Sequence, residues 1–150
     1  MKRITSALYI FLIASTLGCS KKSDDLPEQA ATKFPVPTWK EDDTGKYPAT
    51  MTAVFALPVT LAAGSTENDK LAALVDDECR GVGTIVEVNS QKLFFVLIQG
   101  LPEETKNINI RYYSNKTSYM YESKSALTFL ADGVFGTAEN PKILELIQLK

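Results

Sequence analysis

The 150-residue sequence contains no histidine, only two cysteines and a single tryptophan. Histidine is the commonest general base and the commonest metal ligand, so its absence removes the usual centre of acid–base catalysis and of metal binding. Cys19 and Cys79 are far apart and have none of the closely spaced partners that a metal cluster needs. The sequence also lacks a phosphate-binding glycine loop and a Gly-x-Ser-x-Gly motif. We therefore expect no cofactor, no metal and no catalytic residues.

A cationic surface is also lacking. Lysine and arginine number 16 against 18 aspartates and glutamates, a net charge of −2. Removal of the N-terminal segment described below would take away Lys2 and Arg3 and leave 14 cations against 18 anions, a net charge of −4. Such a chain offers no basic patch to a phosphate backbone, so a nucleic-acid partner is not expected.

What is present is an ordinary globular composition, with 45% hydrophobic and 23% charged residues, at a length typical of one domain. The N-terminus differs from the rest: Lys2 and Arg3 precede the apolar residues 4–17, and Gly18 precedes Cys19. A basic start, a short apolar stretch and a small residue before the cleavage point are typical of a secretory signal peptide, here residues 1–18. An uncleaved anchor helix is the alternative, although the apolar stretch is short for a bilayer span.

The ending Leu17-Gly18-Cys19-Ser20 resembles the lipobox of bacterial lipoproteins, with Thr16 where leucine is usual. The resemblance implies that Cys19 becomes an acylated N-terminus and that the membrane is a partner, because several acyl chains together give durable anchoring. The polar residues 20–25 look like the acidic export tag of Bacteroidetes-type surface lipoproteins, which implies an outer-membrane, cell-surface location. A solvated tether is the other interpretation.

Residues 19–48 are predicted to be the lipidated N-terminus and a flexible, extended linker, because prolines recur there without hydrophobic periodicity. Its apolar end, with Trp39, is expected to dock on the domain edge. Residues 49–150 are predicted to fold as one domain of about eight strands. We expect these strands at residues 49–57, 79–88, 92–99, 108–113, 119–122, 127–131 and 143–149, the last closing the sheet.

The stretch from Asp69 to Val88 organises this prediction. Residues 71–75 are read as a strand that turns at Asp76 and Asp77 into the strand at 79–88, although a short helix at 71–75 is an alternative. Gly81 and Gly83 within the second strand indicate a bulge or a close backbone approach. The strand at 92–99 is apolar on both faces, so we expect it to lie centrally and to be buried on both sides, under an edge helix or loop on its outer face.

The predicted fold class is all-β: an antiparallel, two-sheet, immunoglobulin-like β-sandwich. The order of Trp39, Glu78-Cys79-Arg80-Gly81-Val82, Tyr112-Tyr113 and the stretch from Phe129 to Gly133 is similar to an uncharacterised module of Bacteroidetes-type surface proteins. The resemblance implies a fold and a location and brings no catalytic residue with it.

Three groups of residues are candidates for chemistry. Tyr113, Tyr119 and Tyr121, with Trp39, are the candidate ligand-binding residues, because an outward tyrosine and its cross-strand neighbours can form a platform for sugar rings; core packing is the alternative. Asp76 and Asp77 are read as a charged turn in preference to a calcium site. Cys79 is read as a structural, mostly buried thiol.

The expected function is a surface-exposed lipoprotein that acts as a non-catalytic binding or adhesion module for a glycan or protein ligand. An accessory subunit of an outer-membrane or secretion assembly is the alternative. A small hydrolase is the third reading, and it is disfavoured because the sequence shows no activated base or nucleophile.

Overall fold

The computed structural model describes residues 31–150. The predicted signal peptide, the lipidation site Cys19 and the polar residues 20–25 lie outside the described residues. In the described part, no helix is long and apolar enough to cross a membrane.

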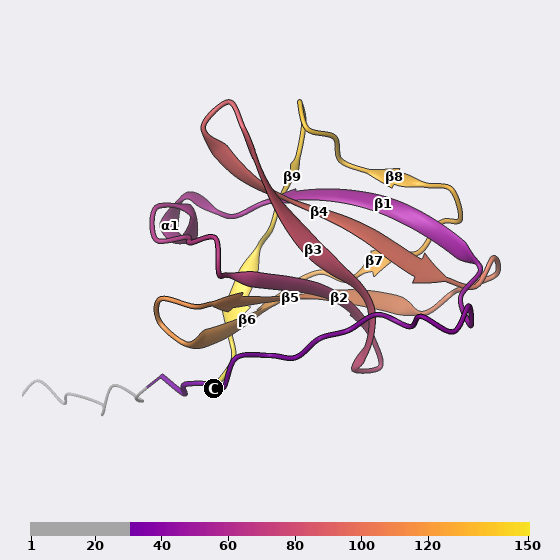
Figure 1. The fold of residues 1–150 in the computed structure, drawn as a ribbon, viewed down its shortest axis with the longest axis horizontal. Coiled ribbons are helices and arrows are strands. Elements are labelled where there is room, and N and C mark those ends of the chain that lie inside the picture. The colour runs from indigo at the N-terminus through magenta and orange to yellow at the C-terminus, as the bar shows by residue number, and fades with distance from the viewer. Residues whose placement is uncertain (1–30) are drawn as a thin grey trace, which may run out of the picture.

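This part of the chain is almost entirely β-structure, as predicted (Figure 1). One short helix, α1 (Val59–Ala62), follows the first strand. The strands are β1 (Ala49–Ala56), β2 (Lys70–Val75), β3 (Glu78–Val88), β4 (Gln91–Gly100), β5 (Asn107–Ser114), β6 (Tyr119–Ser123), β7 (Leu127–Thr128), β8 (Val134–Phe135), β9 (Lys142–Ile143) and β10 (Leu146–Gln148).

The strands form one curled sheet in the order β10-β6-β5-β2-β3-β4-β1-β8, with β7 on β5 and β9 on β1. The expected separation into two sheets is not observed, because β3 continues from one half of the molecule into the other. Its first residues pair with β2, and from Gly83 onward it pairs with β4. The sheet is also mixed, since β8 and β9 run parallel to β1. The resulting shape is a half-barrel.

The predicted hairpin at the centre of the sheet is confirmed. Residues 71–75 form strand β2, and Asp76 and Asp77 make the turn with φ angles of 49° and 65°. Aspartate tolerates this left-handed region better than most residues. The predicted irregularity is present too, because the register shifts between Ala73 and Leu74 where β2 faces Gly81.

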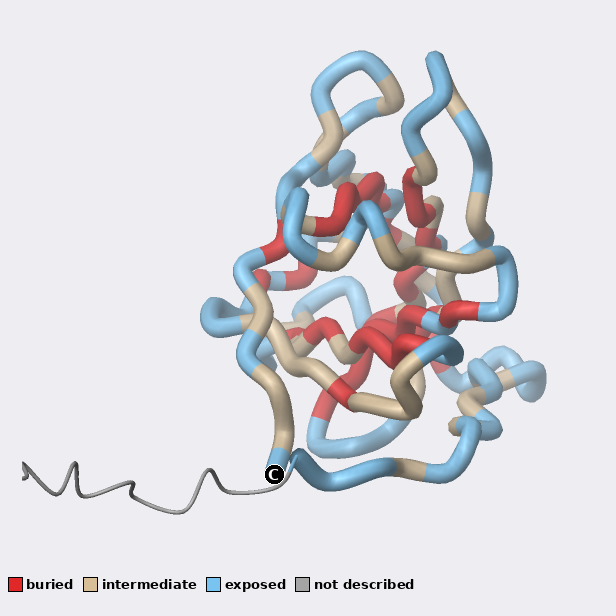
Figure 2. Tube along the Cα trace, turned by 90° about the vertical axis from the view of Figure 1, so that its left-hand side faces the viewer, coloured by how far each residue is buried: buried red, intermediate tan, exposed pale blue. Residues whose placement is uncertain are grey.

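The core fills the concave face of the half-barrel, and Figure 2 shows the buried residues gathered inside it. Alternate residues of β1, β2, β4 and β5 supply it, among them Phe55, Leu71, Phe94 and Ile110. The opposite face of β4 is covered only in part: Leu93 packs in a small second cluster, whereas Leu97 is 55% exposed. The prediction that this strand is buried on both faces is therefore wrong in part, because its outer face is covered at Leu93 and exposed at Leu97.

The segment before β1 lies across the sheet and is hydrogen-bonded to it. We call residues 31–48 the strap. The Phe34 amide donates to the Ser118 carbonyl at the β5–β6 turn (2.8 Å), and the Glu41 carboxylate accepts from the Val82 amide of β3 (3.1 Å). The segment is extended, as predicted, but from Phe34 onward it is tied to the domain and is not a free linker. Figure 1 shows it passing beneath β2 and β3 before it enters β1.

The C-terminal segment closes one end of the half-barrel, as the sequence predicted for residues 143–149. Its first part, β9, pairs with β1, and the Leu144 amide donates to the Ala56 carbonyl (3.0 Å). Its second part, β10, pairs with β6, and the Glu145 carbonyl accepts from the Lys124 amide (2.9 Å). The segment therefore bridges the two edges of the curled sheet.

A candidate binding window

The predicted aromatic platform does not form. Tyr113 is only 2% exposed and pairs with Met120, whereas Tyr119 and Tyr121 pair with Ser114 and Tyr112. Because paired residues of antiparallel strands share a face, Tyr113 lies on the face opposite to Tyr119 and Tyr121. Tyr121 instead packs against Tyr112, with ring centroids 5.8 Å apart. The alternation was read correctly, but the outward face at Tyr113 is covered, so the platform hypothesis is wrong in its geometry.

Trp39, the fourth predicted ligand-binding residue, belongs to the strap and is half-buried. A second residue of the strap explains how this segment is held. The Tyr47 hydroxyl donates to Glu78 (2.7 Å), and the Arg80 guanidinium lies 3.5 Å from the centroid of the Tyr47 ring. Arg80 is itself only 5% exposed and is paired with Glu104 at 3.2 Å. Buried stacking of this kind is a strong form of cation–π contact.

The acidic turn is neutralised by side chains of the protein. Asp76 pairs with Lys106, and Asp77 pairs with Arg111 at 2.7 Å. Within residues 31–150, no group of three or more potential ligands is placed to hold a metal ion. The charged-turn interpretation fits this arrangement, because each aspartate has a cation as its partner.

Cys79 is a free, half-buried thiol, and its Sγ lies 3.7 Å from the Gly81 carbonyl oxygen. Burial raises the pKa of the Cys79 thiol, and the nearby Glu41 carboxylate acts in the same direction. Thiolate formation is thus disfavoured, which suits a structural thiol and does not suit a nucleophile.

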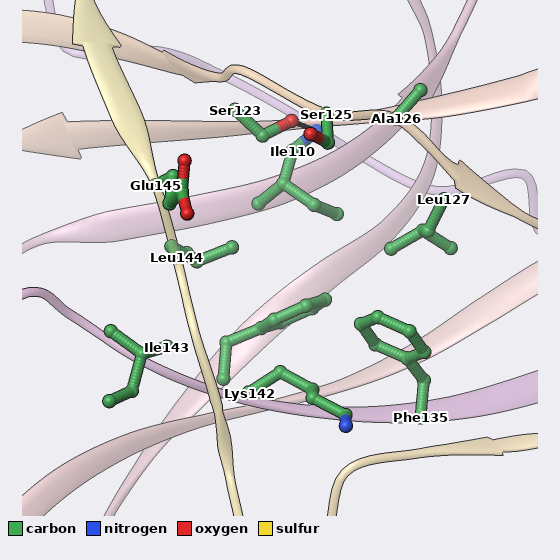
Figure 3. A pocket seen from close by; sticks show the side chains of 11 residues that line it. Ile110, Ser123, Ser125, Ala126, Leu127, Phe135, Lys142, Ile143, Leu144 and Glu145 are labelled. Carbon is green, nitrogen blue, oxygen red and sulfur yellow. Dashed lines mark hydrogen bonds between the residues drawn. The ribbon is translucent and has the colours of Figure 1, made fainter.

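A cavity of about 220 Å³ opens in the wall of the half-barrel where no strand bridges β7 to β8. We call it the window. The C-terminal segment bounds it on one side, and the loop before β7 bounds it on the other (Figure 3). Its apolar lining consists of Phe55, Ile110, Leu127, Phe135, Ile143 and Leu144. The window therefore gives solvent access to the concave core.

The floor and the mouth of the window differ in exposure. Phe55, Ile110 and Leu127 are buried members of the core, so they are held in place by the surrounding sheet. Phe135 is 36% exposed, and its ring lies 6.0 Å from that of Phe55 at an interplanar angle of 54°. Tilted aromatic pairs at this separation are favourable, so Phe135 is placed as a side wall over a fixed floor.

Charged and hydroxyl groups lie at the rim of the window. Ser123, Ser125 and Glu145 are in the upper part of the view in Figure 3, and Lys142 is in the lower part, beside Phe135. Lys142 Nζ lies 5.6 Å from the centroid of the Phe135 ring. Neither Lys142 nor Glu145 forms an ion pair with another described side chain. Both charges remain available to a ligand.

The Ser123 hydroxyl already has one partner at the rim. Its Oγ accepts a hydrogen bond from the Ile110 amide (3.0 Å), at a point where β6 separates from β5 and the backbone amide would otherwise be unpaired. The hydroxyl hydrogen of Ser123 is still free to donate. The Ile110 amide, at the end of the β5–β6 pairing, therefore has a side-chain partner, and the window beside it stays open.

Reasoning from the sequence missed the window completely. Its walls come from β1, β5, β6, β7, β8 and β9, and most of these residues read as ordinary strand positions. One signal was available: Phe135 and Ile143 are large apolar residues in a region rich in turn residues, where burial is least expected.

No family model matches this chain, and no curated protein and no solved structure is significantly similar to it.

Proposed function

We propose that this protein is a lipid-anchored outer-membrane protein, displayed on the cell surface, whose half-barrel is a non-catalytic binding module. The observation that supports a binding role most directly is the window, an apolar cavity with a fixed aromatic floor and unpaired charges at its rim. Preformed, mostly apolar cavities with a few polar groups are the usual ligand sites of proteins. The absence of histidine from the sequence favours binding over catalysis.

The ligand class follows from the lining. Phe55, Leu127 and Leu144 offer hydrocarbon surface, and they suit an apolar group better than the hydroxyl-rich face of a sugar. Among the ligands that the sequence suggested, a glycan stacked on tyrosines is thus less well supported, because Tyr113 is buried.

A neutral single-ring probe tests the binding role. Benzyl alcohol and the detergent-solubilised full-length lipoprotein are expected to give saturation transfer in NMR spectra. Ala126→Trp, at the mouth of the window, should abolish the signal, whereas Ala63→Trp, at another exposed alanine away from the window, should retain it. No signal with the wild type, or an unchanged signal with Ala126→Trp, would contradict the proposal.

The anchor is tested separately. Cys19→Ala is expected to abolish acylation and to leave the precursor uncleaved by the lipoprotein pathway. If the variant still enters the detergent phase as the wild type does, the lipoprotein assignment is wrong. Digestion of intact cells with protease tests surface display, because only a surface-exposed half-barrel is accessible.

A second candidate function, an accessory subunit of an outer-membrane or secretion assembly, is favoured by one observation. On the outer face of the sheet, Leu97 and Val134 flank Thr52 in one row and are 55% and 69% exposed. Exposed apolar rows of this kind occur at protein interfaces. A photo-cross-linking residue at position 97 should capture a membrane protein in intact cells if this function holds, and nothing if it does not.

A further inference from the structure

We infer that the window binds a small zwitterion, an α-amino acid whose side chain is a single ring or a branched apolar group. This inference rests on the proposed binding function and adds the class of ligand.

The size of the cavity limits the apolar part of the ligand. The window has a volume of about 220 Å³. An apolar cavity of roughly 150 Å³ is sufficient for benzene, and pockets for drug-sized molecules begin near roughly 300 Å³. The window lies between these values, so its volume suits one ring or a branched chain better than a drug-sized or polymeric ligand.

The closed ends of the window exclude an extended chain. The C-terminal segment joins β1 to β6 at one end. At the other end the stretch between β7 and β8 crosses to β1, where the Asp132 amide donates to the Thr50 carbonyl (2.8 Å) and the Gly133 carbonyl accepts from the Thr52 amide (2.9 Å). Because the protein's own backbone crosses both ends of the window, an extended ligand chain cannot run through it. The ligand therefore enters with its apolar end first and leaves its polar groups at the rim.

The rim presents one cation and one anion on a single segment. Lys142 and Glu145 are three residues apart in an extended stretch, so their backbone positions are about 10 Å apart. Both side chains line the window, Glu145 on the side of Ser123 and Ser125 and Lys142 on the side of Phe135, so a small ligand that carries both charges can contact the two. The carboxylate of Glu145 and the hydroxyls of Ser123 and Ser125 form an acceptor-rich end suited to an ammonium, and the amine of Lys142 is suited to a carboxylate.

The position of Lys142 is restrained by its neighbours. A Cβ at Gly136 would lie 3.1 Å from Lys142 Cγ, so the stem of the lysine packs closely against this glycine. Gly136 has a φ angle of +81°, which glycine adopts freely. The amine then lies near the Phe135 ring at the mouth of the window. The cation is thus held beside the apolar opening and not free over the whole surface.

A panel of single-ring compounds tests this inference on the detergent-solubilised full-length lipoprotein by NMR titration. L-phenylalanine carries both charges, phenethylamine only the cation, 3-phenylpropanoate only the anion, and benzyl alcohol neither. L-phenylalanine is expected to bind tightest. Lys142→Gln should weaken the binding of L-phenylalanine and 3-phenylpropanoate by about tenfold and leave the binding of phenethylamine unchanged. Glu145→Gln should weaken the binding of L-phenylalanine and phenethylamine by about tenfold and leave the binding of 3-phenylpropanoate unchanged. Lys116→Gln and Glu139→Gln, exposed charges outside the window, serve as controls.

The outcomes separate this inference from the function on which it rests. Equal binding of all four compounds would overturn the inference of a zwitterionic ligand and leave the window as an apolar binding site. The same conclusion would follow if Lys142→Gln and Glu145→Gln left the binding of every compound unchanged. A single-charge compound that binds as tightly as L-phenylalanine would also overturn it. No binding of any of the four would overturn the inference and the proposed function together.

Discussion

Two carboxylates, Glu78 and Asp69, are held in their ionised form by hydrogen bonds. Lys46 and Tyr47 donate to Glu78 and lower its pKa from 4.5 to about 2. Burial alone raises the pKa of Asp69, but hydrogen bonds from Tyr112 (2.6 Å), Thr66 and Asn115 outweigh burial and hold it below its usual 3.8. Asp69 thereby ties the chain before β2 to the β5–β6 turn.

These depressed pKa values predict acid sensitivity. Above pH 4.5 both carboxylates are ionised in the folded and unfolded states, and their stabilisation is fully present. As the pH falls from 4.5 toward 2, the unfolded chain takes up protons first, so the stabilisation is lost. The urea midpoint of the wild type should decline over this range, and Glu78→Gln should make the decline shallower. Glu139→Gln, an exposed carboxylate without an ion pair in the described part, should follow the wild type.

The second prediction at the residue scale concerns the Cys79 thiol. It is half-buried and its pKa is raised, so both access and thiolate formation are reduced. We expect slow modification by a thiol reagent in the native protein and fast modification in urea, measured by the absorbance of the released chromophore. Equally fast labelling in the two states would show that the thiol is accessible and reactive.

At the scale of elements, the β2–β3 hairpin is the centre of the sheet. Ala73 is fully buried on the concave face of β2, together with Leu71 and Val75. Ala73→Asp would place an uncompensated charge there, at a cost of about 3–5 kcal/mol, and should lower the melting temperature strongly or prevent folding. Ala63→Asp, at an exposed alanine, should melt near the wild-type temperature. A melting temperature of Ala73→Asp close to that of the wild type would rule out the strand.

The strap is the second element whose stability can be measured by itself. Its Glu41 carboxylate accepts from the Val82 amide, so this amide reports when the strap opens. Tyr47→Phe removes the hydroxyl that donates to Glu78 and keeps the ring that stacks on Arg80. Because this hydroxyl is one of the contacts that tie the strap to β3, hydrogen exchange at Val82 should accelerate, while that at Ala73 changes little.

Tyr119→Phe is the matched control for the strap. Its hydroxyl forms no hydrogen bond with the described residues, so exchange at Val82 should stay as in the wild type. If Tyr47→Phe also leaves Val82 unchanged, the Tyr47–Glu78 contact does not hold the strap in place.

The sequence predicted the strands of the sheet well, because strand positions depend on local signals. Alternation places the strands to within a few residues, and the Asp76-Asp77 turn fixes the central hairpin. The two-residue strand β8 was missed, since Val134 and Phe135 are too short a pattern to recognise. Burial of Arg80 was missed as well, because an arginine in a strand is ordinarily solvent-facing and the strap that covers it is distant in the sequence.

On the scale of the whole molecule, the architecture depends on the curl of the sheet. The local hydrophobic pattern of the sequence does not determine this curl. β3 passes close to its neighbours at two glycines: a Cβ at Gly81 would lie 2.5 Å from the Leu97 carbonyl oxygen, and one at Gly83 would lie 3.3 Å from Leu71 Cβ. The glycines were recognised as a sign of close approach, but which strand approaches is a tertiary fact. A continuous, curled β3 produces a half-barrel in place of two packed sheets.

The window follows from the same architecture. Its walls come from β1, β5, β6, β7, β8 and the C-terminal segment, which are far apart in the sequence. Periodicity can identify the apolar residues but cannot tell which of them remain accessible. The positions of charged residues in the sequence have the same limitation. Lys142 and Glu145 have the pattern of ordinary surface residues, and only the fold places them at the rim of a cavity.

The location of the bound ligand is the most direct test of this account. In NMR spectra of the methyl-labelled, detergent-solubilised lipoprotein with L-phenylalanine, the ligand ring protons should give nuclear Overhauser contacts to the methyl groups of Ile110, Leu127 and Leu144, which line the window. Contacts confined to Leu97 and Val134 on the outer face, or to no methyl group at all, would contradict the window as the binding site.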